Sequence, residues 1–597
     1  MEEKVIKIPF RRLFGAVLLS LFLSGFILFA LFFVGLIGGF SLFGDDVEGV
    51  KSNTVLHMRL GGTISENAVT EIDPLSVSVF SSKGLSAILF GLKQASEDDR
   101  IRGLFLDFGD INCGIATAQE IREGLEQFKK SKKFIVAYNS GEYVSQKAYY
   151  LASVADEVYG FPSSVFQWTG LGGEVFFIKE LMAKLGLEVA ILKGDNNDFK
   201  SAVEPLFLNS ISDSSRLQMD TYLNSTWSTM LHDISSSRSI PEEKLDVLAE
   251  EMRIKNVKDA VEYQLMDSSM YLDQVYDLLM KKVKVSDRAD LNLYSFSTYS
   301  ESEFIDDQLL ANSGDPSVAV ILAEGSISKN GEGFTSEKIC QYFRDVREIE
   351  SIKSVVFRVN SPGGSALASE EIWREVYLTN KVKKVVVSMG DYAASGGYYV
   401  ATPAHMIFAD KATITGSIGV FGVLPYTKKM LGKIGVEVEG IGTNTHSILS
   451  TNRKLTDAEF KMAQAEVNAI YEQFLERVGT GRKMTRDQVQ RVARGRVWTG
   501  EDALDIGLVD SIGSLQSAIS YAQKLIKSSE NQVVYYPEVK ENPLAVLLEM
   551  VNNEKLNTKS GISILQHPVL RSLENKLETI SEWEGNVMRL PYQFDMR

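Results

Sequence analysis

The sequence contains two copies of one pattern, spaced 249 positions apart. Tyr-Tyr-Leu-Ala at 149–152 matches Tyr-Tyr-Val-Ala at 398–401, and Leu-Gly-Leu-Glu-Val at 185–189 matches Ile-Gly-Val-Glu-Val at 434–438. The chain has 597 residues, too many for a single hydrophobic core, so two or more domains are expected. Duplication is therefore the strongest constraint on the fold, because both copies must form the same kind of unit.

Each copy alternates apolar strands with amphipathic helices in the same order. The predicted pairs are the strands 54–60 and 317–323, the helices 86–95 and 336–346, the strands 103–108 and 354–359, and the strands 134–138 and 384–388. Strands rich in Val, Ile and Phe that alternate with helices indicate βα units and not a β-sandwich. We therefore predict an α/β fold for both copies.

The N-terminus carries a long uncharged run. Residues 13–44 contain no charged side chain, and this length exceeds the roughly 20 residues that cross a bilayer. Basic residues precede the run and two aspartates follow it, which places the N-terminus in the cytoplasm. A cleaved signal peptide is the alternative, but its apolar core spans only roughly 7–15 residues. We expect a cytoplasmic segment at 1–12, a transmembrane anchor at 13–44, and the rest of the chain on the periplasmic, outer face of the inner (cytoplasmic) membrane.

The other domain boundaries follow the repeat. The first copy spans 50–290, a linker rich in Ser, Asp and Asn spans 291–315, and the second copy spans 316–528. The tail at 529–597 has no counterpart in the first copy, and residues 544–551 within it have the pattern of a short amphipathic helix.

Charge and metal-binding residues exclude some classes of function. The net charge of −15 argues against nucleic acid as a partner, because phosphate binding needs basic patches. Cys113 and Cys340 have no metal-ligand spacing, and Asp, Glu and His show no ligand clustering. No metal or organic cofactor is expected.

Ser395 has the sequence surroundings of a nucleophile. It lies in Ala-Ala-Ser-Gly-Gly, where a predicted strand ends and a helix begins near Gly396. A serine at a helix N-terminus has its oxygen near free backbone N–H groups, which favour developing negative charge. An N-cap serine is the structural alternative. The preceding strand ends in Ser-Pro-Gly-Gly at 361–364, which can supply a second N–H, whereas the matching loop of the first copy lacks Pro-Gly-Gly.

The two copies retain complementary halves of a candidate Ser/Lys pair. At the repeat offset Ser395 faces Gln146, and Lys200 faces Leu449. A lysine can act as a general base when burial lowers its pKa from about 10.4, because the neutral amine then accepts the hydroxyl proton. Lys200 has apolar neighbours, as this role requires. The rival candidates for the base are Lys454 and His446.

Five motifs together resemble the long, duplicated form of bacterial signal peptide peptidase A, also called protease IV. They are Lys-Ser-Ala-x-Glu-Pro, Ser-Pro-Gly-Gly, Ala-Ala-Ser-Gly-Gly-Tyr-Tyr, Thr-Gly-Ser-Ile-Gly-Val and Gly-Arg-Val-Trp-Thr-Gly. The resemblance implies two tandem crotonase/Clp-protease-like domains and a serine endopeptidase with a Ser/Lys dyad split between them. The site residues that it implies are Ser395 as nucleophile, Lys200 as general base, Ser417 orienting the lysine, and Gly363 or Gly364 with Gly396 as the oxyanion hole.

The resemblance also implies a setting. The expected substrates are released signal peptides and other apolar peptides, the expected assembly is a homotetramer, and membrane lipid is a further partner. The sequence leaves two alternatives open. One is a crotonase-type acyl enzyme, which uses the same oxyanion hole without a serine nucleophile, and the other is a non-catalytic membrane scaffold that binds peptides.

Overall fold

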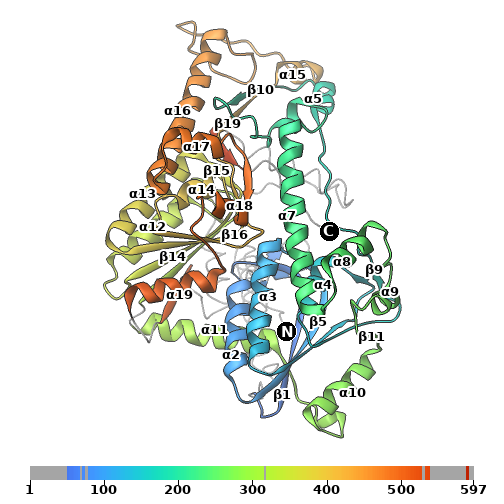
Figure 1. The fold of residues 1–597 in the computed structure, drawn as a ribbon. Helices are drawn as coiled ribbons and strands as arrows, with labels where there is room; N and C mark the ends of the chain where they lie inside the picture. Colours follow the sequence, from blue (N-terminus) through green and yellow to red (C-terminus); the bar gives the residue numbers. More distant parts are fainter. Residues whose placement is uncertain are drawn as a thin grey trace, which may run out of the picture.

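The fold consists of two α/β units that follow one another along the chain (Figure 1). The computed structural model describes residues 50–67, 70–73, 78–81, 83–314, 317–331, 333–527, 532–537 and 586–589. The anchor predicted at 13–44 and the helix predicted at 544–551 lie outside these residues. Within them, no helix combines the length and the apolarity that crossing a membrane requires. In both units helices cover a largely parallel sheet, so the predicted duplication of an α/β fold is confirmed.

The first sheet belongs to the first repeat. Its strands, in sheet order, are β11 (Ser268–Ser269), β8 (Glu157–Gly160), β6 (Phe134–Asn139), β5 (Ile101–Asn112), β1 (Thr54–Ser65) and β12 (Leu293–Ser295). Neighbours in this order are parallel. Leu104 and Phe105 on β5 point to opposite faces and are both buried, as expected for a parallel sheet covered on both sides.

The second sheet repeats this parallel arrangement. Its strands, in sheet order, are β20 (Val497–Thr499), β18 (Ile414–Gly416), β16 (Lys384–Ala394), β14 (Ser354–Ser361), β13 (Val318–Glu324) and β22 (Val533–Tyr536). Strands β17 (Met406–Ala409) and β21 (Ser511–Ile512) are placed beside β16 as β8 and β11 are beside β6. The second sheet differs in an edge strand, β20, that pairs antiparallel with its neighbour. Strand β22 pairs in parallel with β13 just as β12 pairs with β1. The expectation that the tail has no counterpart in the first copy was therefore wrong for its first strand. A four-residue strand at a sheet edge carries too little pattern to reveal this relationship.

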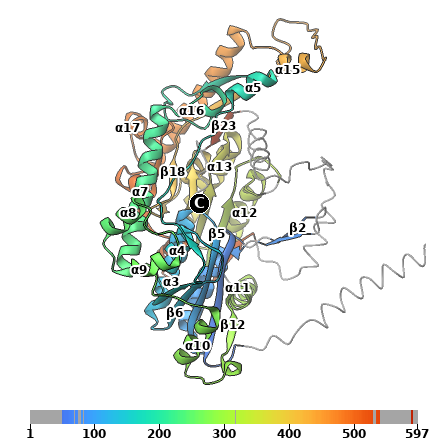
Figure 2. The ribbon, with the colours of Figure 1, turned by 90° about the vertical axis from the view of Figure 1, so that its right-hand side faces the viewer.

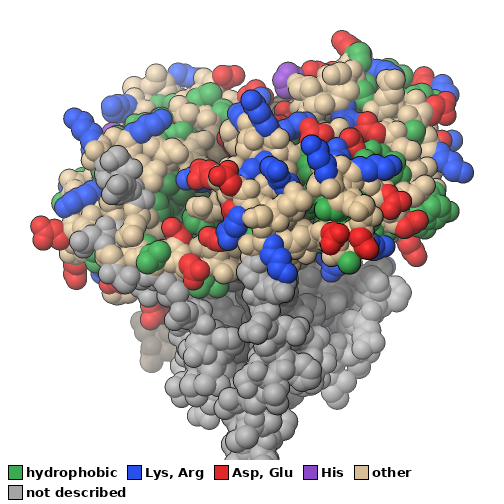
Figure 3. All heavy atoms as spheres, turned by 90° about the horizontal axis from the view of Figure 1, so that it is seen from below, with side chains coloured by type: hydrophobic (Ala, Val, Ile, Leu, Met, Phe, Trp, Pro, Cys, Tyr) green, Lys and Arg blue, Asp and Glu red, His purple; other side chains and the backbone are tan. Residues whose placement is uncertain are grey.

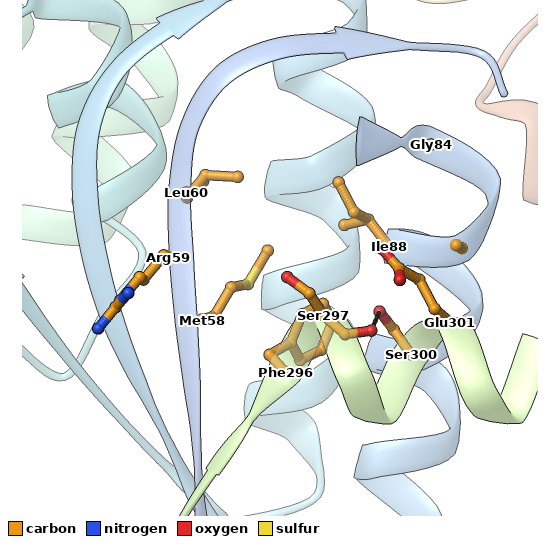
Figure 4. A pocket seen from close by; sticks show the side chains of 10 residues that line it. Met58, Arg59, Leu60, Gly84, Ile88, Phe296, Ser297, Ser300 and Glu301 are labelled. Atoms are coloured by element: carbon orange, nitrogen blue, oxygen red, sulfur yellow. Dashed lines mark hydrogen bonds between the residues drawn. The ribbon is translucent and has the colours of Figure 1, made fainter. Parts of the chain in front are cut away.

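The segment expected to be a linker, 291–315, is instead regular secondary structure. It contains β12 and an eighteen-residue helix, α11 (Phe296–Ser313). The helix is largely polar in composition, but one of its faces is buried. This face is formed by Phe296, Tyr299, Ser300 and Phe304. This face packs on α2 (Leu85–Glu97) at Gly91, where a Cβ atom would lie 2.3 Å from Cβ of Ser300. Figure 4 shows a small cavity beside this contact, between β1, α2 and α11.

Helices complete each unit, and the predicted helices 86–95 and 336–346 are confirmed as α2 and α12. In the first repeat they are α3 (Ile115–Lys130), α4 (Gln146–Ala152), α5 (Lys179–Leu185), α6 (Glu204–Phe207), α7 (Asp213–Arg238), α8 (Glu242–Glu250), α9 (Val257–Glu262) and α10 (Leu272–Val283). In the second they are α12 (Ser336–Glu348), α13 (Ala366–Val382), α14 (Gly396–Ala401), α15 (Lys428–Lys433), α16 (Asp457–Arg482), α17 (Arg486–Val492), α18 (Gly500–Asp505) and α19 (Leu515–Ile526). The long helices α7 and α16 are equivalent, and each begins after a Ser or Thr N-cap.

A small third sheet joins the two repeats. Its strands, in order, are β10 (Glu188–Lys193), β19 (Phe421–Tyr426), β23 (Asn586–Arg589) and β15 (Gly363–Ser365). Strand β10 of the first repeat pairs antiparallel with β19 of the second along all of its residues. Because of this pairing, the residues that follow β10 in the chain lie against the second repeat. Figure 2 shows β23 between the labels of α13 and α16, in the upper half of the molecule.

Buried charges also join the repeats. Arg358 on β14 lies 2.9 Å from Glu66 and 2.6 Å from Glu120 on α3, and all three side chains are buried. Breaking a buried ion pair is strongly destabilising because it leaves an uncompensated charge. The repeats must therefore dock with these side chains in register. At the surface, charges of both signs are interspersed, as Figure 3 shows for the lower face.

Candidate active site

Ser395 lies where β16 ends and α14 begins. Its backbone has φ 56° and ψ −114°, a conformation that residues other than glycine rarely adopt. Its side chain makes no capping hydrogen bond to α14, so the N-cap alternative does not account for it. In other hydrolases a strained strand-to-helix turn of this kind presents a serine hydroxyl to substrate.

Lys200 of the first repeat reaches Ser395 of the second. Its Nζ atom lies 2.7 Å from Oγ of Ser395, 2.9 Å from Oγ of Ser417 and 3.1 Å from the carbonyl oxygen of Ser417. All three side chains are fully buried. The structure thus brings together the lysine and both serines that the sequence singles out, although they come from different repeats.

The surroundings of Lys200 favour its neutral form. Burial lowers the pKa of the amine well below its ordinary value, and the positive charge of Lys193 lowers it further. In the described part of the chain Lys200 takes part in no ion pair that would restore the charge. A neutral amine 2.7 Å from a hydroxyl oxygen is placed to accept the hydroxyl proton.

The second repeat holds the backbone around Lys200. The amide of Phe199 donates to the carbonyl of Arg494 at 3.0 Å, and Arg494 forms an ion pair with Asp198. Gly495 has φ 76°, and a Cβ atom there would lie 2.6 Å from Cβ of Lys200. The Gly-Arg-Val-Trp-Thr-Gly motif that begins at Gly495 has no role that the sequence alone predicts. The structure shows that this glycine makes room for the lysine.

Ser417 completes the contacts of the lysine amine. It lies in the left-handed region with φ 49°, directly after β18, and its amide donates to the carbonyl of Arg496 at 2.7 Å. Its hydroxyl and its carbonyl both contact Nζ of Lys200. These two contacts fix the position of Nζ of Lys200, and they therefore restrict where Oγ of Ser395 can lie around it.

Two glycine segments line the space beside Ser395. Gly363 has its carbonyl bonded to the amide of Ile327 at 2.9 Å and its own amide bonded to Oγ of Ser361 at 3.1 Å. Successive residues of a strand direct their amides to opposite edges, so Gly364 directs its amide away from Ile327. A Cβ atom on Gly396 would lie 3.2 Å from the nitrogen of Gly364. Gly396, the residue after the nucleophile, therefore lies next to the amide of Gly364.

The two rival bases lie elsewhere. Lys454 is exposed and pairs with Glu188 at 2.7 Å, and this carboxylate raises the pKa of Lys454, which is the opposite of what a base needs. His446 is exposed and lies 3.0 Å from Glu459. Among the described contacts, neither is bonded to Ser395.

The described residues offer little else of catalytic type. They contain no group of three or more His, Cys, Asp or Glu side chains that could hold a metal ion. Cys113 and Cys340 are free thiols, and burial raises the pKa of both, so neither is an activated nucleophile.

The sequence is similar to a family of known peptidases. The model of peptidase family S49 matches residues 127–286 and again residues 378–529. "Protease 4" of Haemophilus influenzae is 32% identical over 535 residues, which cover 85% of each chain. "Serine protease SPPA, chloroplastic" of Arabidopsis thaliana is 31% identical over 560 residues, 92% of this chain and 79% of the relative. "Protease 4" of Salmonella typhi is 32% identical over 463 residues, 76% of this chain and 73% of the relative.

The two matched segments fall in the two α/β repeats, and each contains one of the residues that meet at the buried Ser/Lys contact. The relatives extend over both repeats, so the duplication is shared with them. The chain therefore belongs to peptidase family S49, as a long serine peptidase that contains the family's domain twice.

Proposed function

We propose that this S49 peptidase is a membrane-anchored endopeptidase that hydrolyses released signal peptides and other apolar peptides, with Ser395 as nucleophile and Lys200 as general base. The observation that carries the proposal is the 2.7 Å separation of Nζ of Lys200 and Oγ of Ser395, both fully buried. Two such groups in contact away from water form a nucleophile–base pair.

The reaction follows from this geometry. The neutral amine of Lys200 takes the proton of Ser395 as Oγ attacks the peptide carbonyl. The amides of Gly364 and Gly396 stabilise the oxyanion, and Ser417 orients the lysine. The ammonium then protonates the leaving amine, and a water activated by the same lysine hydrolyses the acyl-enzyme. We assign the donor to Gly364 and not to Gly363, because Ser361 already accepts from Gly363.

The substrate class is supported by the family and by the N-terminal run. Two of the similar proteins are named signal peptide peptidase or SPPA. The uncharged residues 13–44 would hold the enzyme at the bilayer in which released signal peptides reside. We therefore propose the inner membrane, with the catalytic repeats on its outer face, as the location.

We further propose that the protein forms the homotetramer that the family resemblance implies, and an exposed apolar area supports this proposal. Ile434, Val436, Val438 and Ile441 follow α15 and are exposed, Ile441 to 96% of its surface. Leu185 at the end of α5 is exposed as well, and in Figure 1 α5 and α15 lie together at the top of the molecule. Apolar patches on a surface commonly mark sites of protein–protein or membrane contact.

The test is hydrolysis of a quenched peptide with a leucine-rich core by the full-length protein in detergent. Ser395→Ala and Lys200→Ala should each lower kcat/KM by about a thousandfold or more. Lys454→Ala, which alters a solvent-exposed lysine, is the matched control and should retain activity within about twofold. Activity that survives Lys200→Ala but is lost in Lys454→Ala would overturn the assignment.

The same proteins separate the two alternatives. A crotonase-type acyl enzyme would keep its activity in Ser395→Ala, since it needs no serine nucleophile. A peptide-binding scaffold would not be labelled by a serine-directed phosphonate. We expect one phosphonate per chain on Ser395, observed by mass spectrometry of the intact protein and absent in Ser395→Ala.

A further inference from the structure

Gln218 of helix α7 contacts the chain on both sides of Lys200. Its amide nitrogen, Nε2, donates to the carbonyl of Phe199 at 3.2 Å and to Oγ of Ser201 at 2.8 Å. These two residues stand directly before and after the lysine. The side chains of Gln218 and Ser201 are buried, which strengthens hydrogen bonds between them. Gln218 therefore restrains the backbone from which the lysine side chain extends.

The oxygen of the same carboxamide contacts the second repeat. Oε1 of Gln218 accepts a hydrogen bond from the amide of Val497 at 3.2 Å. Val497 belongs to the motif that begins at Gly495, the glycine that makes room for Lys200. A carboxamide offers both N–H donors and an oxygen acceptor, and Gln218 uses both kinds of group across the boundary between the repeats.

Helix α7 also packs beside the nucleophile. Tyr222 lies four residues after Gln218, and residues four apart share one face of a helix. Tyr222 is buried in a cluster with Ala394 and Val497, and Ala394 directly precedes Ser395. This face of α7 thus packs on β20 of the second repeat (Figure 1). The helix is therefore held in place relative to both members of the Ser/Lys pair.

Lys200 needs such support because it lies in neither a helix nor a strand. Its segment runs from the end of β10 at Lys193 to the start of α6 at Glu204. Catalytic side chains on irregular segments keep their position only when neighbouring groups fix them. Loss of about 1 Å of precision can cost about a hundredfold in rate.

The second repeat has neither residue at the equivalent position. Helices α7 and α16 each have 26 residues, and the sixth residue is Gln218 in one and Met462 in the other. Met462 is exposed over 59% of its surface, and Leu449 faces Lys200 at the repeat offset. The glutamine and the lysine thus occur in the same repeat, as expected if Gln218 acts through Lys200.

We propose that Gln218 is a positioning residue of the Ser/Lys pair, whose carboxamide joins the segment that carries Lys200 to the second repeat and so sets the separation of Nζ from Oγ of Ser395. This inference rests on the proposed peptidase function, in which Lys200 is the base. Among the described hydrogen bonds, those of Nζ go to Ser395 and Ser417. Gln218 therefore acts through the backbone of the lysine segment and not on the amine itself.

The test compares Gln218→Met with a matched variant at a distant site, both in the full-length protein. Methionine has a similar length but no N–H donor, so the lysine segment loses its attachment. We expect kcat to fall about ten- to a hundredfold with KM within about twofold of the wild type, since substrate binding is retained.

Gln308 of α11 provides the control. It is a buried glutamine that bonds Val533 and Tyr535 of β22 through both ends of its carboxamide. Gln308→Met therefore loses comparable hydrogen bonds away from the active site. Its kcat should stay within about twofold of the wild type.

The pH profile distinguishes positioning from a general loss of stability. Gln218→Glu keeps the length of the side chain and places a carboxylate beside the residues that flank Lys200. A nearby opposite charge favours the ammonium, so the pH at which kcat/KM is half-maximal should rise by about one unit or more. Gln308→Glu introduces the same charge away from the site and should leave this midpoint unchanged. Melting temperatures of the four variants report any general destabilisation.

Hydrogen exchange gives a readout that does not depend on hydrolysis. In Gln218→Met, exchange should be at least about threefold faster in the segments 197–204 and 494–498, because both lose a hydrogen bond to α7. Gln308→Met should leave exchange in these two segments as in the wild type.

The outcomes separate failure of this inference from failure of the proposed function. The inference is overturned by unchanged exchange or unchanged kcat in Gln218→Met, by an unmoved midpoint in Gln218→Glu, or by equal losses of kcat in Gln218→Met and Gln308→Met. If the wild type never hydrolyses peptides, faster exchange in Gln218→Met would uphold the joining role of Gln218 and count against the peptidase function alone.

Discussion

The carboxylate of Asp391, four residues before Ser395, accepts hydrogen bonds from the amide and the hydroxyl of Thr117 at 2.8 and 2.7 Å. It also accepts from the amide of Gly114 at 3.0 Å. A side chain of the second repeat therefore caps helix α3 of the first, whose own N-cap residue, Gly114, has no side chain. A Cβ atom on Gly114 would lie 2.1 Å from Cγ of Asp391, so the contact requires the glycine.

Replacing Asp391 should weaken both the fold and the activity. We expect Asp391→Ala to lower the free energy of unfolding by about 1–2 kcal/mol, the usual effect of losing a helix cap. It should also lower kcat, because the strand that ends at Ser395 loses its attachment to the repeat that supplies Lys200. Denaturant unfolding and peptide hydrolysis measure the two effects. Asp110→Ala, an exposed aspartate of the first repeat, is the control, and equal behaviour of the two variants would contradict the prediction.

The activity should rise with pH through the lowered pKa of Lys200. The amine is a base only when neutral, so kcat/KM should increase as pH passes that pKa and then level off, with a midpoint well below the usual lysine value of about 10.4. Lys200→Arg keeps its charge at every accessible pH and should be inactive throughout. A midpoint near the ordinary lysine pKa, or an active arginine variant, would argue against a desolvated lysine base.

Lys200 should also make the protein less stable than a neutral side chain would. Its pKa is lower in the folded than in the unfolded chain, so the unfolded chain binds more protons between the two values, and stability rises with pH across that window. Lys200→Met should therefore unfold at a higher temperature than the wild type. This advantage should be largest in acid and shrink as pH approaches 10.5. A difference in Tm that does not vary with pH would contradict the linkage.

Gly495 should be sensitive to substitution although it takes no part in the chemistry, with a smaller loss of activity than the dyad variants show. An alanine there would be strained at φ 76° and would press on Lys200, and displacing a catalytic group by about 1 Å can cost about a hundredfold in rate. We expect Gly495→Ala to lower kcat about a hundredfold while the protein remains folded by circular dichroism. Gly172→Ala is the matched control, because a Cβ there meets nothing within 4 Å. Equal kcat for the two variants would exclude the role of Gly495.

The sequence predicted the elements that carry strong local patterns. Strands β5 and β14 and helices α2 and α12 lie where apolar periodicity placed them, because each buries a continuous face. The meeting of Lys200 with Ser395 was predictable because each repeat kept only one of the two residue types. The likeness of the repeats to the crotonase and Clp-protease folds stays a prediction.

What the sequence did not reveal depends on contacts between distant segments. Strands β22 and β23 are four residues long and are defined by the edges they join, so neither has a signal of its own. Gly495 and Asp391 act across the boundary between repeats, which a comparison of one repeat with the other does not display. Helix α11 was predicted to be part of a linker, because most of its residues are polar and only a narrow face of it is apolar and buried.

The antiparallel pairing of β10 with β19 has a consequence for when the protease becomes active during its synthesis. Translation delivers the first repeat before the second, and domains generally fold in that order. In the proposed mechanism, a nascent chain therefore contains Lys200 before Ser395 has been made and cannot yet hydrolyse neighbouring chains. Activity begins only when the last-made repeat has folded and docked, so assembly of the two halves serves the purpose that removal of a propeptide serves in a zymogen.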